Sequence, residues 1–398
     1  MNEKEGNSMK LVIHDLNREE WNKISDKYEG WKVVYDNGKI KPCVGCFGCW
    51  VKTPGQCVIK DGYEKMGGLI HKAEEVVVIS TYTYGCLSSF VKNVFDRSIG
   101  WVLPFFEIVD GEMHHKKRYP ENKNISFIFR GNGLADDDKA AAKQYVEAAC
   151  RNFRGTVKSV SFEEMNNEVI TEKDAQAVST EFDPDKIILL NSSLRGDNAN
   201  TRKFLNRMAE RMEGKAEIIN IGTYMSKQDE LISLLSSAGK IVLGMPMYVD
   251  GVPSALLRIM EGLEKYSKNT DRNNERKVYA VINMGLYESV QIKNIFTQVK
   301  KWSDICGYDY SGGIGIGAGE MNGNFASAPS GSKGPAKNAN DGLDKMTDII
   351  IKSEKMEDVY ADAYKFPRKL YMFLANLSWP MDGKKNGLTK KDLYRRYQ

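Results

Sequence analysis

The stretch KIILLNSSLRGDNANTRKFLNRM, residues 186–208, contains a complete strand–loop–helix unit. An apolar run is followed by small polar residues and then by apolar residues at helical spacing. Arg195 adds a cation to the loop, and the helix that follows adds the positive end of its dipole. This combination suits a phosphate monoester. The alternative is an ordinary strand–helix turn with Asn200 or Thr201 as the N-cap.

The same alternation of strand and helix extends in both directions along the chain. Strands are expected in the first half at residues 9–15, 31–36, 73–81, 124–129 and 155–162. Strands are expected in the second half at residues 186–193, 216–222, 240–246, 277–285 and 310–319. Strands that alternate with helices predict a parallel sheet with helices on both faces. Because the order occurs twice, the sequence predicts an α/β protein with two tandem copies of one fold.

The region after the third strand of each half supports this duplication. Tyr82 is followed ten residues later by Lys92, and Tyr248 is followed ten residues later by Arg258.

The predicted domains are residues 1–165, residues 182–320, and a C-terminal helical extension at residues 321–398. The polar segment 163–184 is the expected linker. The extension is expected to open with a flexible loop, residues 321–340, because Gly, Ser, Asn and Pro are frequent there.

Composition narrows the class of protein. The chain has 398 residues, 41% hydrophobic and 28% charged, and a net charge of +4. So small a charge gives no support for nucleic-acid or membrane partners, and no apolar run approaches the roughly 20 residues that span a bilayer. The first ten residues lack the apolar core of a signal peptide, so we expect a cytoplasmic protein.

Four cysteines lie close together in KPCVGCFGCWVKTPGQCVIKD, residues 41–61: Cys43, Cys46, Cys49 and Cys57. In a reducing compartment such a group more often binds metal or carries redox chemistry than forms structural disulfides. Three interpretations remain open: a [4Fe–4S] cluster, free or redox-active thiols, and a tetrahedral zinc site.

The loop NSSLRGDNANT resembles the phosphate loop of NAD(P)H-dependent FMN reductases and other flavodoxin-like oxidoreductases. Ser192, Arg195, Asn200 and Thr201 match that pattern, whereas Asn191 replaces the usual glycine. GMPMYVDGVPSALLR, which starts at residue 244, resembles the second flavin loop, and NMGLYE, which starts at residue 283, lies where the third belongs.

The resemblance implies two flavodoxin-like, doubly wound parallel-sheet domains and an FMN site in the second domain. The implied cofactor-binding residues are Ser192, Ser193, Arg195, Asn198, Asn200, Thr201, Pro246, Met247, Tyr248, Val249, Asn283, Met284 and Gly285.

The cysteine segment resembles that of the iron–sulfur flavoproteins, which implies that its four cysteines are cluster ligands. It departs from their pattern at Gly62, where a second acid usually follows Asp61.

Each half lacks a feature that the other half has. The first half has no phosphate loop, and Asp15, Glu19 and Glu20 stand where a phosphate would be repelled. The second half has no cysteine segment. We therefore expect a covalent pseudo-dimer with FMN in its second half and the cysteine centre in its first.

The resemblance implies an enzyme that transfers electrons from NAD(P)H through FMN to a small organic acceptor or a redox partner protein, and that forms a homodimer. No side-chain acid or base is assigned. The alternatives are a non-enzymatic electron carrier, a redox-sensing interaction protein, and a zinc-stapled scaffold.

Two further stretches each allow more than one role. WVLPFF, which starts at residue 101, is expected to pack in the core, with an interface or a wall of the substrate pocket as the alternatives. His114 and His115 are expected in a surface loop, with a lid over the flavin as the alternative.

Overall fold

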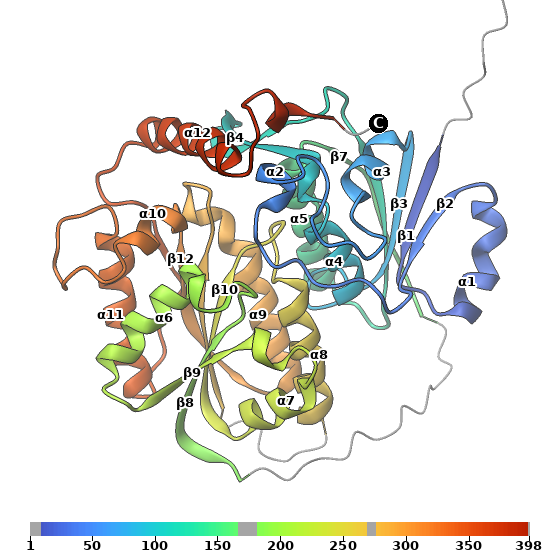
Figure 1. Ribbon diagram of the computed structural model, residues 1–398. Coiled ribbons are helices and arrows are strands. Elements are labelled where there is room, and N and C mark those ends of the chain that lie inside the picture. Colours follow the sequence, from blue (N-terminus) through green and yellow to red (C-terminus); the bar gives the residue numbers. More distant parts are fainter. Residues whose placement is uncertain (1–8, 166–180, 269–275, 397–398) are drawn as a thin grey trace, which may run out of the picture.

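A computed structural model describes residues 9–165, 181–268 and 276–396 (Figure 1). Two parallel β-sheets form the two halves of the molecule, and helices cover them. No helix in these ranges is both long and apolar enough to cross a bilayer.

The first sheet contains the five strands expected from the sequence. Its order is β2 (Lys32–Tyr35), β1 (Lys10–His14), β3 (Glu75–Thr81), β6 (Asn124–Arg130) and β7 (Thr156–Glu163). All neighbouring pairs are parallel. The accompanying helices are α1 (Arg18–Ile24), α3 (Met66–Lys72), α4 (Ser89–Asp96) and α5 (Asp136–Asn152). The middle of β3 is buried throughout, because helices pack on both faces of the sheet.

The second sheet repeats this arrangement. Its order is β9 (Ala216–Asn220), β8 (Asp183–Asn191), β10 (Ala238–Pro246), β11 (Lys277–Asn283), β12 (Asp309–Ile316) and β13 (Val359–Ala361). Its helices are α6 (Asn200–Arg211), α7 (Gln228–Ser236), α8 (Ser254–Ser267), α9 (Lys293–Cys306), α10 (Gly319–Asn324) and α11 (Lys337–Ile351). Apart from the added β13, both sheets have the strand order 2-1-3-4-5 of the flavodoxin-like fold. The predicted fold class is confirmed.

The segment after residue 320 is divided between the two halves. Leu343 and Met346 of α11 belong to the same core as Phe204 of α6 and Val242 of β10. In contrast, α12 (Arg368–Lys385) packs on the first half, against β4 (Val102–Val109) and α2 (Gly48–Val51). β4 forms an antiparallel hairpin with β5 (Glu112–Lys117) that the sequence did not predict.

The segments that were expected to be a linker and a loop are in part ordered. The ends of segment 163–184 continue β7 and lead into β8, whereas residues 166–180 lie outside the described part of the chain. Arg207 fixes the segment that was expected to be a flexible loop, because its guanidinium donates to the carbonyls of Ala326 and Ala328, both at 2.8 Å.

The two halves pack through equivalent helices. α4 contacts α8, and both contribute to one core that spans the halves. Asp96 on α4 accepts a hydrogen bond from the first backbone N–H of α8, at Ser254 (3.0 Å). Glu261 on α8 accepts in return from Ser89 at the start of α4. The two acids occupy equivalent positions in their helices, so the contact has an internal two-fold character.

The turns after β3 and β10 show which residues of the two halves correspond to each other. Thr83 pairs with Cys86, and Tyr248 pairs with Gly251, each in an antiparallel bridge whose two central residues have positive φ. The equivalent of Tyr248 is therefore Thr83 rather than Tyr82, one residue away from the pairing suggested by the sequence.

Candidate functional site

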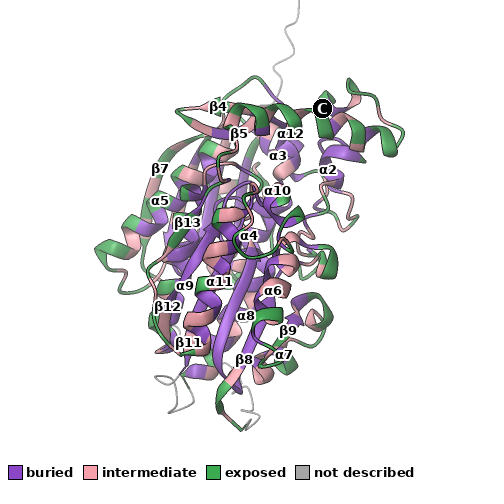
Figure 2. Ribbon diagram, turned by 90° about the vertical axis from the view of Figure 1, so that its left-hand side faces the viewer, coloured by how far each residue is buried: buried purple, intermediate pink, exposed green. Residues whose placement is uncertain are grey.

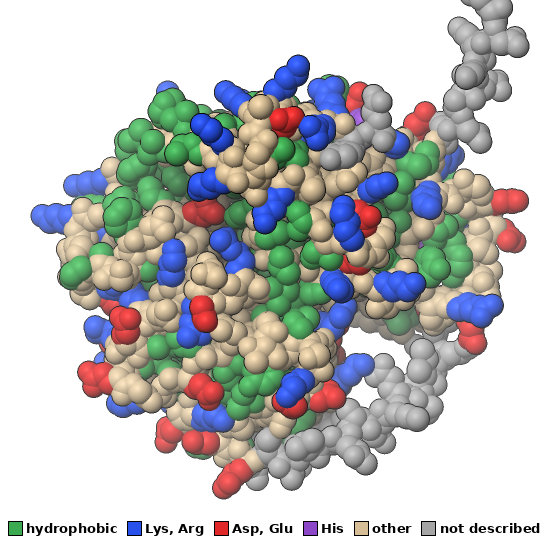
Figure 3. Space-filling view, in the orientation of Figure 1, with side chains coloured by type: hydrophobic (Ala, Val, Ile, Leu, Met, Phe, Trp, Pro, Cys, Tyr) green, Lys and Arg blue, Asp and Glu red, His purple; other side chains and the backbone are tan. Residues whose placement is uncertain are grey.

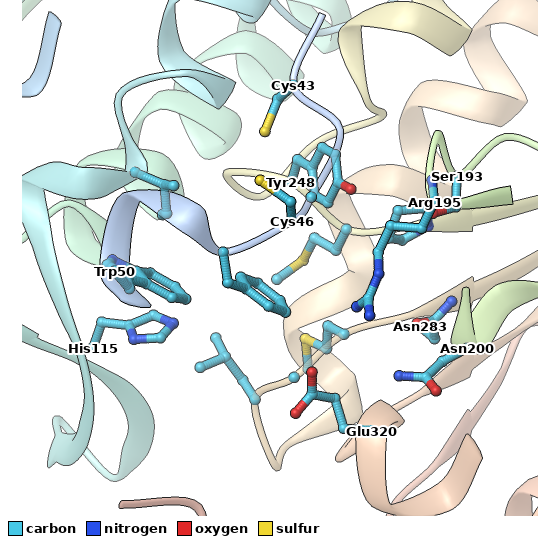
Figure 4. Close-up of a pocket in the computed structure, with 18 of the residues that line it drawn as sticks. Cys43, Cys46, Trp50, His115, Ser193, Arg195, Asn200, Tyr248, Asn283 and Glu320 are labelled. Carbon is cyan, nitrogen blue, oxygen red and sulfur yellow. The ribbon is translucent and has the colours of Figure 1, made fainter. Parts of the chain in front are cut away.

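One cavity of about 460 Å³ lies where the two halves meet (Figure 4). The loops that follow β8, β10 and β11 line it on one side, at the carboxyl ends of the strands. The cysteine segment and the hairpin strand β5 line it from the first half, and α12 contributes a third wall. Its size is that of a typical cofactor or small-molecule site.

The loop after β8 is held by the side chain of Asn191. Its Nδ2 donates to the carbonyl of Gly196 (3.0 Å) and to Oδ1 of Asn220 (2.8 Å). Its Oδ1 accepts from the backbone N–H of Ser193 (3.3 Å). The side chain is fully buried and joins both ends of the loop, so it stiffens the loop.

Helix α6 begins at this loop without a side-chain cap. Its N-cap residue is Ala199, which has no side-chain acceptor for the first backbone N–H groups. Such N–H groups and the positive end of the helix dipole form an anion site. Asn200 and Thr201, the first two residues of the helix, both line the cavity.

Arg195 brings a cation to the same place. Its side chain points into the cavity (Figure 4), and its guanidinium carbon lies 5.8 Å from the centre of the Phe47 ring. No ion pair or hydrogen bond of this guanidinium occurs with other residues in the described ranges. Burial raises the pKa of Glu320 on the opposite wall, and Arg195 partly offsets that rise. The cavity therefore holds one unpaired cation next to an uncapped helix.

The second and third loops are joined to the first by Asn283. Its Nδ2 donates to Oγ1 of Thr201 (2.7 Å) and to the carbonyl of Met245 (3.2 Å). Its carbonyl accepts from the backbone N–H of Met247 (2.8 Å). These bonds fix the three loops relative to one another.

The turn after β10 has a strained backbone that the first half holds in place. Val249 and Asp250 have φ of 42° and 56°, and a β-branched residue rarely adopts such an angle. The fully buried Lys92 donates to the carbonyl of Tyr248 (2.7 Å). Nδ2 of Asn152 lies 2.7 Å from both carboxylate oxygens of Asp250. Burial raises the pKa of Asp250 to about 6.

The cysteine segment reaches across to this turn. A Cβ added to Gly45 would lie 1.9 Å from the Tyr248 hydroxyl, so glycine is required for the close approach. Beyond it, Phe47 stacks on Trp50 at 5.3 Å, and Trp379 of α12 meets both rings edge-on. These rings form an aromatic wall of the cavity.

His115 extends the wall from β5. Its ring lies 4.6 Å from that of Trp50 and 4.7 Å from that of Phe106. Burial lowers the pKa of His115 to about 4, so the ring is neutral at physiological pH. His114 and His115 were expected in a surface loop, with a lid over the flavin as the alternative. The position of His115 at the cavity is closer to the second of these. Phe106, from the stretch WVLPFF, also lines the cavity.

All four clustered cysteines line the cavity as free thiols. In the described ranges, no group of three or more potential ligands is arranged to hold a metal ion. Arg97 instead donates to the Cys57 sulfur (3.0 Å) and pairs with Asp61. Burial raises the pKa of Cys43 to about 12. The arrangement gives no support to the metal-binding interpretations.

The predicted cofactor-binding residues line this cavity with two exceptions. Ser192 lies behind the loop, where its hydroxyl donates to the carbonyl of Gly244 (2.8 Å). Asn198 is exposed on the outer side of the loop. Sequence reasoning missed a further set of lining residues, most of which come from other elements: Trp50, Asn152, Asp250, Glu320, Met321, Phe325, Tyr371, Leu374 and Trp379.

The equivalent place in the first half is filled by the protein itself. The buried Asp15, directly after β1, accepts from the backbone N–H of Thr81 (2.8 Å). His14 stacks on Trp21 at 4.1 Å, and Glu20 pairs with Arg130 at 2.9 Å. Carboxylates therefore lie near this strand end of the first half, whereas the corresponding region of the second half has the loop that carries Arg195.

No protein-family model matches the chain. No curated protein matches it either. Several solved structures align with it, among them the following three. An FMN-dependent NADH-azoreductase from Bacillus anthracis, in complex with FMN, is 14% identical over 42% of this chain and 98% of its own, with a TM-score of 0.31. An azoreductase from Bacillus anthracis is 11% identical over 42% and 99%, with a TM-score of 0.31. Trp repressor binding protein from Bacillus subtilis is 12% identical over 37% and 99%, with a TM-score of 0.28.

Proposed function

We propose that the chain is an FMN-dependent oxidoreductase that takes electrons from NAD(P)H and passes them to a small organic acceptor or a partner protein. The observation that carries this proposal is the uncapped start of α6 with the unpaired Arg195 next to it, at the rim of a largely apolar cavity. The uncapped helix and Arg195 fit the phosphate tail of FMN, and the apolar cavity fits its ring.

The residues divide into two groups along the cavity. The backbone N–H groups of Asn200 and Thr201, together with Arg195, would bind the phosphate. Met247, Tyr248 and Met284 would contact the flavin ring, because they follow the neighbouring strands β10 and β11 and line the same space. FMN supplies the chemistry when bound, since it accepts a hydride and returns the electrons to an acceptor.

The protein's own contribution is to position the cofactor and the acceptor and to exclude water from the site. Lys92 and Asn152 hold the turn at Tyr248–Gly251 in its strained conformation. The aromatic wall of Phe47, Trp50 and Trp379 leaves an apolar space in which an acceptor would lie against the ring. No proton transfer is assigned to a side chain.

The proposal includes one FMN for each chain, bound by the second half. In the first half Asp15 and Glu20 occupy the region where a phosphate would bind. The first half serves instead to build the wall and to hold the turn.

The experiment is to add excess FMN to the purified chain and to record flavin absorbance after desalting, followed by NADH and NADPH consumption with a soluble quinone. We expect a yellow protein and steady consumption of one nicotinamide. A yellow protein that consumes neither would favour the electron-carrier alternative, whereas a protein that retains no FMN would contradict the proposal.

A further inference from the structure

Helix α12 carries a row of exposed apolar side chains. The row consists of Leu370, Phe373, Leu374, Leu377 and Met381, whose side chains are 43–65% exposed. At 100° per residue these five positions fall on one face of the helix. Trp379 lies on the opposite face and is buried. We call the five residues the α12 ridge; Figure 3 shows hydrophobic side chains gathered in this part of the surface, at upper left.

Positive charge surrounds the α12 ridge. Residues 365–396 contain nine Lys and Arg against two Asp, a net charge of +7, although the whole chain carries only +4. The exposed Lys369 stands at the start of the helix, and Lys384 and Lys385 stand at its end. The small total charge of the chain hides this concentration.

The ridge is held outward by the packing of the opposite face. The Asn376 side chain accepts from the backbone N–H of Phe106 (2.6 Å) and donates to its carbonyl (3.1 Å). Arg118 donates to the carbonyls of Leu393 and Arg395, both at 2.8 Å, and so fixes the chain beyond the helix. Figure 2 shows α12 at the edge of the molecule, with exposed residues on its outer side. The ridge is therefore a fixed feature of the folded surface.

We propose that the α12 ridge docks on an anionic lipid surface. The helix would lie in the plane of the membrane with its apolar side chains among the acyl chains and its terminal lysines among the headgroups. An anionic lipid surface offers an apolar acyl layer for the side chains of the ridge and negatively charged headgroups for the lysines at the two ends of the helix.

A protein partner explains the ridge less well. Its five half-exposed side chains offer about 400 Å², about half of the roughly 800 Å² that each partner of a stable complex buries. A second copy that paired along the helix would bring Lys369 close to lysines of like charge. Protein interfaces also carry about one hydrogen bond per 100–200 Å², and the ridge itself presents only apolar side chains.

Docking would bring the cavity to the lipid surface. Leu374, Ala375, Ser378 and Trp379 of α12 all line the cavity. An apolar acceptor dissolved in the membrane would then enter without crossing water. This consequence rests on the proposed oxidoreductase function, whereas the docking does not.

The test is co-sedimentation of the full chain with vesicles of phosphatidylcholine alone and of phosphatidylcholine mixed with an equal amount of phosphatidylserine. We expect binding to the mixed vesicles only, with weaker binding at high salt. The double variant Phe373→Ser/Leu377→Ser and the double variant Lys384→Glu/Lys385→Glu should each weaken binding by about tenfold or more. None of these four residues lines the cavity.

The matched control is Ile305→Ser, because Ile305 on α9 is exposed to a similar degree, 48%, but lies outside the ridge. It should bind as the unaltered chain does, and circular dichroism should show all variants folded. The proposal is overturned if mixed vesicles do not bind the chain, or if the ridge variant binds them equally well. It is also overturned if soluble polyglutamate binds as tightly as the vesicles, or if the ridge variant dissociates a dimer in light scattering.

Discussion

Arg195 is the residue on which the cofactor assignment depends most directly. The change Arg195→Gln should weaken FMN binding by about 10- to 100-fold, since a hydrogen bond to a charged group contributes about 1.5–3 kcal/mol. Quenching of flavin fluorescence during a titration measures this change.

The control for Arg195 is Arg202→Gln. Arg202 lies in α6, the helix that follows the loop of Arg195, but its guanidinium bonds Asn206 and Asn220, pairs with Asp197 and does not line the cavity. This variant removes the same charge and should bind FMN nearly as the unaltered chain does. Equal effects of the two substitutions would mean that the cation acts only through the general field of the protein.

Asp250 should give folding stability a specific pH dependence. Its pKa rises from 3.8 to about 6 on folding because of burial, so between these values the folded state binds more protons than the unfolded state. Its contribution to stability therefore falls as the pH rises from about 4 to about 6, and is constant above that, with a full amplitude of about 3 kcal/mol.

The change Asp250→Asn removes this titration. Urea unfolding at a series of pH values should show the variant gaining stability over the unaltered chain as the pH rises toward 6. The difference between the two proteins cancels the titration of His14 and His115, which both share. A difference that stays constant with pH would contradict the assignment.

Sequence reasoning found the site residues that follow strands and missed those that arrive from elsewhere. Arg195, Asn200 and Thr201 were predictable because a strand, a small-residue loop and a helix follow one another in the chain. Glu320 and Trp379 reach the cavity only through tertiary packing, and nothing local in their sequence signals it.

At the scale of elements, the contact between the cysteine segment and the turn after β10 is tested by Gly45→Ala. The new Cβ would lie 1.9 Å from the Tyr248 hydroxyl, so the ring must move into the cavity. We expect weaker FMN binding and a lower melting temperature.

Gly38→Ala is the matched control for this contact. Gly38 has a similar φ, +72° against +65°, but no atom lies within 4 Å of an added Cβ. It should cost only the roughly 1 kcal/mol of an alanine at positive φ and leave FMN binding unchanged. Equal losses in both variants would show that the contact with Tyr248 is unimportant.

The helix pair α4–α8 contains a buried ion pair whose removal should be costly. Lys92 pairs with Asp96 and donates to the Tyr248 carbonyl. Lys92→Met should lower the free energy of unfolding by about 3–5 kcal/mol, because it leaves a buried carboxylate without its partner. Lys92→Met/Asp96→Asn should recover part of that loss in urea unfolding.

Lys301 provides the comparison. Lys301, on α9 of the second half, also joins the halves, because it pairs with Asp137 and Asp138 on α5 of the first half. Those two carboxylates are partly exposed to water. Lys301→Met should cost less than about 1 kcal/mol. A loss at Lys92 no larger than the loss at Lys301 would contradict the role assigned to the buried pair.

The elements themselves were predictable to different degrees. The ten expected strands form, and the clearest of them, such as β3 and β8, are apolar runs bounded by turns or helices. β4 was missed because its apolar run contains Pro104 and resembles a packing segment rather than a strand. β13 has only three residues and pairs with β12 through a connection that no local pattern specifies.

At the scale of the whole molecule, the two halves form an internal pseudo-dimer whose strand-end regions differ. Reciprocal capping by Asp96 and Glu261 preserves the two-fold contact. The regions next to the strand ends do not preserve it, because one half offers an uncapped helix and Arg195, and the other is filled by Asp15. The sequence indicated this asymmetry through complementary losses, but it did not show that the cysteine segment and the flavin loops border the same cavity.

The stoichiometry of FMN tests this account most directly. Equilibrium dialysis of the purified chain against a range of FMN concentrations should give one equivalent per chain, and Arg195→Gln should weaken that single site. Two equivalents per chain, or none at saturating FMN, would contradict the assignment of one cofactor to the second half.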